Sequence, residues 1–422
     1  MHDLKDWVRH GDEIRRPLLV NPELSKKNKI IIVGGGLSGL CAAFRISEKF
    51  PNKEIIILEK TRKLGGVIHT WIKDEWICDI SVNSSRPHPA VWRLISDLGL
   101  EEHWRISKSE AKYRWLYSNG KRSKLSISTI FKIGPIKLFR GIKNSRKGEK
   151  SVLETIRHKI IADAFTLGIV NDTSNSVDAD FLIPSVTNFG ETPPIKKNKL
   201  NKMINKTYEF EKPIKKSTAT LKYGMEQLTE ALIERITNKS NISVEYNSEF
   251  NSISEIMMRF KVDECAIIWA SPKNNESISY NHILVFAVGY KESANLGIPL
   301  GFGTLIPDNS IPISGILHES DVHYWNRAPQ GSRLFRVMVP SNRFDGNNQS
   351  IKNSLKNILT QEEPDLFEFI GKRRIPKYPP GHLLEISKMK EKHSWIGWSA
   401  AGVSITHVID ECERLVEKML ES

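Results

Sequence analysis

A short apolar run that breaks into glycines and resumes with a helical pattern constrains this chain most: KIIIVGGGLSGLCAAFRI, residues 29–46. Residues 30–33 form the β-branched run typical of a buried parallel strand. Gly34, Gly36 and Gly39 then fit the spacing G-x-G-x-x-G at a strand-to-helix turn. Bare amides and the helix dipole at such a turn favour the pyrophosphate of a dinucleotide. The motif predicts an α/β dinucleotide-binding fold, although glycines in any tight turn can match it.

A second apolar run strengthens this prediction. Residues 54–58 (EIIIL) are typical of another buried strand, and Glu59 ends it twenty residues after Gly39 (59 − 39 = 20). A carboxylate at this position typically accepts hydrogen bonds from ribose hydroxyls. The alternative is a glutamate that caps a helix or lies on the surface.

Composition and charge limit the class of protein. The 422 residues are 39% hydrophobic and 26% charged, as in soluble globular proteins. The formal net charge of +13 favours an anionic partner: a nucleic acid, a phosphate-bearing cofactor, an acidic substrate or an anionic membrane surface. A basic surface without a specific partner is equally compatible with this charge. We expect no nucleic-acid partner, because no aromatic-basic platform or zinc pattern accompanies the charge.

Cysteine spacing and hydropathy exclude further classes. The four cysteines lie far apart without a CxxC pattern, so we expect reduced thiols, no disulfide framework and no metal site. No run reaches the roughly 18 apolar residues of a membrane-spanning helix. Residues 1–28 lack the apolar centre of a secretory signal and contain too many acids for a mitochondrial presequence, so we interpret them as an extension.

Two further stretches resemble flavoproteins of the amine oxidase and protoporphyrinogen oxidase group. After Glu59, KTRKLGGVIHTW resembles the R-x-G-G element of that group through Lys63, Gly65 and Gly66. Residues 395–420, WIGWSAAGVSITHVIDECERLVEKML, resemble its C-terminal element, in which a strand ends in glycine, a short loop passes the flavin and a final helix begins. The resemblance implies FAD as the cofactor. A basic turn and an ordinary amphipathic terminal helix are the alternatives.

Within that group the chain resembles the protoporphyrinogen oxidase family of the oxygen-dependent, eukaryotic type. Four blocks follow the family's order: AKYRWLYSNG at 111–120, LKYGMEQLTEALIERI at 221–236, GFGTLIPDNSIPISGILHES at 301–320 and IPKYPPGHL at 375–383. The resemblance implies an α/β fold with a Rossmann-like FAD-binding domain, a mixed-sheet substrate domain and a helical insertion. It also implies FAD-dependent oxidation of protoporphyrinogen IX to protoporphyrin IX in haem biosynthesis, with O2 as acceptor and hydrogen peroxide as product.

The family's functional residues carry over by position. The resemblance assigns to the cofactor Gly34, Gly35, Gly36, Leu37, Ser38, Gly39, Glu59, Gly66, Val67, Ser81, Val82, Asn83, Ser84, Phe250, Trp398, Val403, Ser404 and Ile405. It assigns Arg114 to a substrate propionate, which a guanidinium pairs with in bidentate geometry. Phe302, Leu305 and Met338 match apolar positions that sandwich the macrocycle. A surface arginine and plain core packing are the alternatives. No catalytic side chain is assigned, because FAD carries the redox chemistry.

The blocks also predict a division of the chain. The expected units are an N-terminal extension (1–28), an FAD-binding unit in three parts (29–105, 216–252 and 376–422), a helical substrate- and membrane-associated unit (106–215) and a substrate-binding sheet unit (253–375). By family analogy we expect peripheral association with the mitochondrial inner membrane and a possible homodimer. KLSISTIFKIGPIKLFRGIK, residues 124–143, interleaves apolar and basic residues as interfacial segments do. A solvated basic face is the alternative.

Two departures from the family leave other functions open. In CDISVNSSRP, residues 78–87, Ser81, Val82 and Asn83 occupy the place of the family's G-P-R, so the arginine is missing. The connection 286–301 is also shorter than in the family. The chain could therefore be another enzyme of the flavin amine oxidase and desaturase group, or a non-catalytic homologue that binds FAD or a porphyrin.

Overall fold

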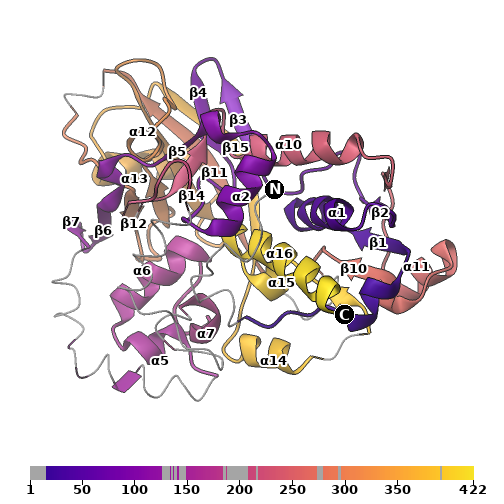
Figure 1. Ribbon diagram of the computed structural model, residues 1–422. Coiled ribbons are helices and arrows are strands. Elements are labelled where there is room, and N and C mark those ends of the chain that lie inside the picture. The colour runs from indigo at the N-terminus through magenta and orange to yellow at the C-terminus, as the bar shows by residue number, and fades with distance from the viewer. Residues whose placement is uncertain are drawn as a thin grey trace.

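Two sheets and the helices around them organise the chain in the computed structural model (Figure 1). The structure describes residues 16–125, 134, 136, 140–141, 149–183, 187, 208–214, 217–272, 279–292, 296–389 and 392–422. Most of the predicted interfacial segment, 124–143, lies outside the described residues. Among the described residues, no helix is long and apolar enough to cross a membrane.

The first sheet is parallel and has five strands. Its order is β16 (Ser394–Trp395), β10 (Ile267–Trp269), β1 (Lys29–Val33), β2 (Glu54–Leu58) and β9 (Ile242–Glu245). The two strands predicted from the β-branched runs are β1 and β2, which pair in parallel register. Alternate residues point to opposite faces, and both faces are buried, as such sheets require.

Helices cover both faces of this sheet. One face packs against α1 (Leu37–Lys49), α2 (Pro89–Asp97), α10 (Glu226–Thr237) and α16 (Ile405–Glu421) in one large core. The other face packs against α11 (Ile253–Phe260) and α14 (His382–Lys388). Together with the βαβ order of β1, α1 and β2, this arrangement is a doubly wound, Rossmann-like unit.

The second sheet is mixed and has seven strands. Its order is β15 (Leu366–Pro376), β11 (Tyr280–Tyr290), β14 (Arg333–Pro340), β13 (Gly315–Leu317), β12 (Gly303–Leu305), β6 (Arg114–Ser118) and β7 (Lys121–Lys124). All neighbours are antiparallel except β12 and β6. One face packs against α13 (Asn348–Ile358).

The opposite face of the seven-stranded sheet meets two groups of elements. At one end it packs against the hairpin of β3 (Thr70–Lys73) and β4 (Trp76–Asp79). At the other end it meets α5 (Val152–Ile156), α6 (Lys159–Ile169) and α7 (Ala179–Leu182), seen at the lower left of Figure 1. The remaining elements are β5 (Trp104–Ile106), β8 (Ala219–Leu221), α12 (Glu319–Val322), α15 (Trp398–Ala401), η3 (Pro22–Lys26), η4 (Glu101–His103), η5 (Ser109–Lys112) and η6 (Glu264–Ala266).

Two segments pair differently from the predicted division of the chain. β10 falls within 253–375, yet it pairs with β1 in the parallel sheet. β6 and β7 fall within the predicted helical unit 106–215, yet they extend the seven-stranded sheet. Both segments are short strands that pair with residues far away in sequence, so hydropathy patterning within a window does not reveal their partners. The fold class itself, a Rossmann-like unit with a separate mixed sheet, is confirmed.

A buried charge network joins three helices of the Rossmann-like unit. Arg45 of α1 contacts Glu413 of α16 at 2.7 Å and Asp97 of α2 at 2.5 Å. Arg93 of α2 contacts the other oxygen of Glu413 at 3.1 Å. These side chains are almost fully buried, so each charge depends on its partner to offset its desolvation. The network fixes α16 against α1 and α2.

Candidate cofactor and substrate site

The glycine turn after β1 is shaped by close backbone contacts. The N–H of Gly34 donates to the carbonyl of Leu58 at 2.8 Å, and Gly34 has a φ of 109°. A Cβ on Gly39 would lie 1.9 Å from the carbonyl oxygen of Gly34, so α1 packs directly on the turn. Among the described residues, no side chain caps the first turn of α1, which also carries no acid. Its amides are therefore free for an anion.

The R-x-G-G element lies against the glycine turn. The N–H of Gly65 donates to the carbonyl of Gly35 at 2.9 Å, and Gly36 forms a bridge with Gly65. A Cβ on Gly66 would lie 2.8 Å from the Cα of Gly36. Val67 follows with 44% of its surface exposed. Two glycine-rich stretches that the sequence predicts to serve one cofactor are therefore adjacent.

Glu59 is fixed at the end of β2 beside the same turn. Its Oε2 accepts from the N–H of Gly35 at 2.9 Å, and its Oε1 accepts from the N–H and hydroxyl of Thr61 at 2.9 and 2.8 Å. Carboxylate oxygens have further acceptor capacity, so a ribose hydroxyl could still bind. The N–H of Ser248 donates to the carbonyl of Glu59 at 2.9 Å, which brings the segment before Phe250 beside this site. Phe250 itself packs near Phe260.

The C-terminal loop reaches the same turn from β16. A Cβ on Gly397, which has a φ of 103°, would lie 2.9 Å from the Oγ of Ser38 in α1. The N–H of Gly397 donates to Oε2 of Glu411 at 2.7 Å. Burial raises the pKa of Glu411 to about 8, although the hydrogen bond from Gly397 acts to lower it. The carbonyl of Trp398 accepts from the hydroxyl of Tyr378 at 3.1 Å.

The segment after β4 bridges the R-x-G-G element and α16. The hydroxyl of Ser81 donates to the carbonyl of Val67, and the hydroxyls of Ser85 and Thr406 lie 3.2 Å apart at the start of α16. Ser404 is the N-cap of α16, but its side chain makes no capping hydrogen bond. The remaining predicted cofactor residues near this segment have these positions: Val82 packs against the core of the Rossmann-like unit, Leu37 and Ile405 are buried, and Val403 and Ser84 are partly buried.

Asn83 stands where the family that the chain resembles has an arginine. Its Oδ1 accepts from the hydroxyl of Ser84 at 3.4 Å. Its Nδ2 is buried and has no hydrogen-bond partner among the described residues. A buried amide donor without a partner costs free energy, so this atom is available to an acceptor on a bound ligand.

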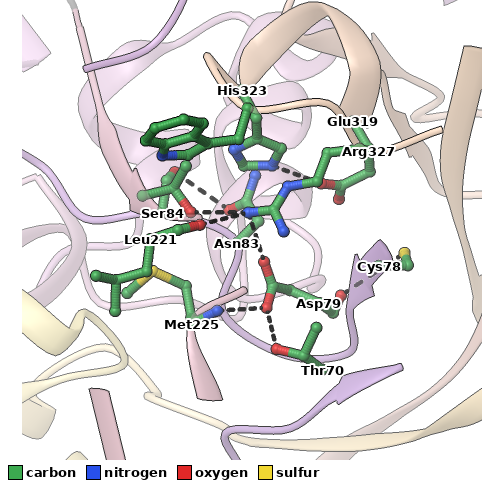
Figure 2. A network of polar contacts seen from close by, with 12 residues as sticks. Thr70, Cys78, Asp79, Asn83, Ser84, Leu221, Met225, Glu319, His323 and Arg327 are labelled. Atoms are coloured by element: carbon green, nitrogen blue, oxygen red, sulfur yellow. Dashed lines mark hydrogen bonds and ion pairs between the residues drawn. The ribbon is translucent and has the colours of Figure 1, made fainter. Parts of the chain in front are cut away.

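A network of buried charged side chains lies close to Asn83 and Ser84 (Figure 2). Asp79 accepts from the hydroxyl of Thr70 at 2.6 Å and from the N–H of Met225 at 2.7 Å, and it faces Arg327 at 3.7 Å. Arg327 also donates to the carbonyl of Leu221 at 3.0 Å. These contacts anchor the residues that precede the segment 81–84.

Glu319 continues this network beneath β14. It accepts from His323 at 2.6 Å and contacts Arg336 at 3.0 Å. Burial acts to raise the pKa of Glu319, but Arg336 and His323 outweigh it and lower the pKa to about 2. The members of this network are scattered from residue 70 to residue 336 and form no local motif, so sequence patterns do not predict it.

The predicted substrate residues lie on the seven-stranded sheet. The guanidinium of Arg114 lies 4.5 Å from the ring centre of Phe302, and no ion pair to Arg114 occurs within the described part of the chain. Burial lowers the pKa of Arg114, and nearby Arg86 lowers it further. A Cβ on Gly315 would lie 2.9 Å from the Cε of Met338 and 3.9 Å from Leu305. Leu305 and Met338 are therefore neighbours, and Met338 is buried.

These residues fit a bound dinucleotide. The ends of β1, β2 and β16 converge on one glycine cradle, where a Cβ on Gly35, Gly39 or Gly66 would collide with neighbouring backbone or side chains. The cradle adjoins uncapped N-termini of α1 and α16 and the fixed carboxylate of Glu59. The contacts of individual residues with FAD stay predictions.

Comparisons with known proteins support a dinucleotide-binding fold. A family model described as NAD(P)-binding Rossmann-like domain matches residues 32–98. A chloroplastic protoporphyrinogen oxidase 1 of spinach (Spinacia oleracea) is 28% identical over 258 residues, which cover 52% of this chain and 46% of the relative, so the chain spans about half of that protein. The protoporphyrinogen oxidase of Schizosaccharomyces pombe is 23% identical, over 88% of this chain and 92% of the relative.

Solved structures show the same fold. A protein from Exiguobacterium sp. 255-15 superposes with a TM-score of 0.68 and 16% identity, covering 94% of this chain and 99% of the other. A putrescine oxidase superposes with a TM-score of 0.63 and 13% identity over the same shares. The chain therefore shares its fold with these two proteins. Within this fold, the sequence is similar to the protoporphyrinogen oxidases.

Proposed function

We propose that this chain binds FAD and oxidises a porphyrinogen, of the class that includes protoporphyrinogen IX, to the corresponding porphyrin with O2 as acceptor. One observation carries the proposal: the chain has both a dinucleotide cradle and a sheet face on which Arg114, Leu305 and Met338 lie. The names of the spinach and fission yeast relatives support the substrate class.

The chain's own residues would hold both ligands. The amides at the N-terminus of α1 would bind the pyrophosphate, and Glu59 would bind the ribose. Arg114 would pair with a substrate carboxylate, because its guanidinium has no carboxylate partner among the described residues and lies partly buried. The apolar side chains of Leu305 and Met338 would exclude water from the macrocycle. FAD, when bound, supplies the hydride acceptor.

Further expectations belong to the same proposal. Peripheral association with the mitochondrial inner membrane, a role in haem biosynthesis and a homodimer follow from the family resemblance. The net charge of +13 supports attraction to an anionic membrane surface.

Product formation tests the proposal. Purified protein supplied with FAD and protoporphyrinogen IX in air should yield fluorescent protoporphyrin and hydrogen peroxide faster than heat-denatured protein does. A panel of primary amines should yield no peroxide. Peroxide from the amines and none from the porphyrinogen would assign the chain to the amine oxidases instead.

A non-catalytic homologue is the second candidate, and Asn83 favours it. The missing arginine removes a cation from the flavin's surroundings, and the amide of Asn83 replaces it with a neutral donor. Such a homologue would bind FAD and porphyrin and form no product.

A further inference from the structure

Arg373 of β15 shares a face of the seven-stranded sheet with the predicted substrate residues. Val285 of β11 pairs with both Gly371 and Met338, and paired residues point to the same face. Arg373 lies two residues after Gly371 and therefore on that face as well. The pairing of Met338 with Gly315, and of Gly315 with Leu305, extends the face across β13 to β12.

Arg114 lies at the far end of the same face. Leu305 of β12 pairs with Leu116 of β6, and Arg114 precedes Leu116 by two residues. β6 and β15 are five strand spacings apart, or about 24 Å along a flat sheet. Long arginine side chains that lean inward would bring the two guanidinium groups closer than their backbones. Leu305 and Met338 lie on the strands between the two cations.

Arg373 has no anionic partner among the described residues. No hydrogen bond or ion pair to its side chain occurs there, although the residue is partly buried. Burial and, to a smaller extent, the nearby charge of Arg336 lower the pKa of Arg373 to about 9. Arg336 is itself paired, with Glu319 at 3.0 Å and with the carbonyl of Asp79. An unpaired, desolvated cation is costly, and an anion from outside the chain would offset that cost.

The position of Arg373 connects it to the cofactor segment. A Cβ on Gly371 would lie 3.1 Å from Ile80, which directly precedes Ser81. Arg374, the next residue, lies on the opposite face, is exposed, and has its guanidinium 4.5 Å from the ring centre of Tyr280. The two neighbouring arginines therefore differ in face and in exposure.

We propose that Arg373 is a second carboxylate-binding position, opposite Arg114, and that the substrate is a porphyrinogen with carboxylates on two sides of its ring. This inference rests on the proposed function. Coproporphyrinogen III carries one propionate on each of its four pyrroles and can reach both cations. Protoporphyrinogen IX carries two propionates, on adjacent pyrroles. These propionates can therefore reach either Arg114 or Arg373, but not both at once. Arg373 would therefore set specificity for the tetracarboxylate.

Porphyrin binding to the FAD-loaded protein tests the inference without turnover. Coproporphyrin III and protoporphyrin IX are titrated separately, and binding is followed by the change in porphyrin absorbance. The parent should bind coproporphyrin III more tightly. Arg373→Gln should weaken coproporphyrin III binding about ten- to a hundredfold, the range for a lost charge-assisted contact, and change protoporphyrin IX binding little. Arg373→Lys should restore part of the loss, and Arg374→Gln should match the parent.

The outcomes separate this inference from the function on which it rests. If the parent binds and oxidises porphyrinogens but Arg373→Gln binds both porphyrins as the parent does, the inference is wrong and the function stands. Equal loss for both porphyrins would also overturn the specificity role. If the parent binds neither porphyrin, the function and the inference are both wrong. A melting temperature of Arg373→Gln at or above that of the parent would show that the variant folds.

Discussion

The carboxyl group of Glu411 accepts a hydrogen bond of 2.7 Å from the backbone N–H of Gly397, across the junction between α16 and the loop after β16. Gly397 in turn lies against Ser38 at the start of α1. α16 thereby positions the loop that closes the cofactor cradle. A Gln at 411 could still accept this bond from the backbone N–H of Gly397 while carrying no charge.

Replacing Glu411 should change how stability depends on pH. Burial raises the pKa of Glu411 from its ordinary 4.5 to about 8, with Asp410 acting in the same direction and Gly397, Arg414 and Arg16 opposing. The stabilising contribution of the protonated acid is therefore complete below pH 4.5 and is lost as pH rises through about 8. The melting temperature of the parent should fall across this window, and that of Glu411→Gln should fall less. Parallel curves would mean that Glu411 ionises normally.

Two glycine substitutions should separate folding from cofactor binding. A Cβ at Gly39 would overlap the carbonyl of Gly34 at 1.9 Å, so Gly39→Ala should displace α1 and lower the melting temperature of the FAD-free protein. A Cβ at Gly36 would meet its nearest neighbour, Gly66, at 3.6 Å. Gly36→Val should therefore fold more stably than Gly39→Ala and still lose FAD, because its side chain obstructs the pyrophosphate. Calorimetry and the flavin absorbance of the purified proteins report both effects.

Truncating Arg114 should weaken substrate binding and spare the cofactor. Its guanidinium lies on Phe302 and makes no ion pair within the described residues, so it is free to bind a carboxylate. Arg114→Ala should reduce porphyrin affinity by about 1.5–3 kcal/mol, the range for a charge-assisted hydrogen bond, with FAD content unchanged. Affinity equal to that of the parent, measured by absorbance titration, would exclude Arg114 from the site.

Restoring the missing arginine should accelerate the reaction. Asn83 lies between the R-x-G-G element and α16, and its buried Nδ2 has no partner among the described residues. A cation there would favour the negative charge that a flavin acquires on reduction, by about 1.5–3 kcal/mol or roughly ten- to a hundredfold in rate. Stopped-flow mixing of Asn83→Arg with porphyrinogen should show faster loss of flavin absorbance than the parent. A slower variant would show that nearby Arg327 and Arg336 already supply the positive charge that stabilises the reduced flavin.

The parts of the fold that local sequence patterns encode were predictable. The β-branched runs before and after α1 correspond to β1 and β2, and the final amphipathic pattern corresponds to α16. β10 lies within the predicted unit 253–375 but pairs with β1, because three residues, IIW, carry too little periodicity to show that pairing. The position of β10 is decided by its pairing with β1, and not by the strand propensity of its own residues.

The site was predictable only where it resembles a motif. The glycine turn, Glu59 and the loop at Gly397 lie together, as their spacing and the family resemblance indicate. Arg373 was not found, because it stands in a run of three basic residues that is typical of an exposed strand edge. Its orientation follows from the register of β15 against β11, which includes a bulge beside Val285. The face of the sheet to which a side chain points beyond a bulge cannot be read from the local sequence.

Anaerobic mixing of the FAD-loaded protein with a porphyrinogen tests the central claim most directly. If the glycine cradle holds FAD next to the face that presents Arg114, Leu305 and Met338, each FAD should take up two of the six electrons that separate a porphyrinogen from a porphyrin, and the flavin absorbance in the blue should bleach. Admitting air should then restore it. A protein that binds no FAD, or one whose bound flavin keeps its absorbance in the presence of proto- and coproporphyrinogen alike, would contradict the account.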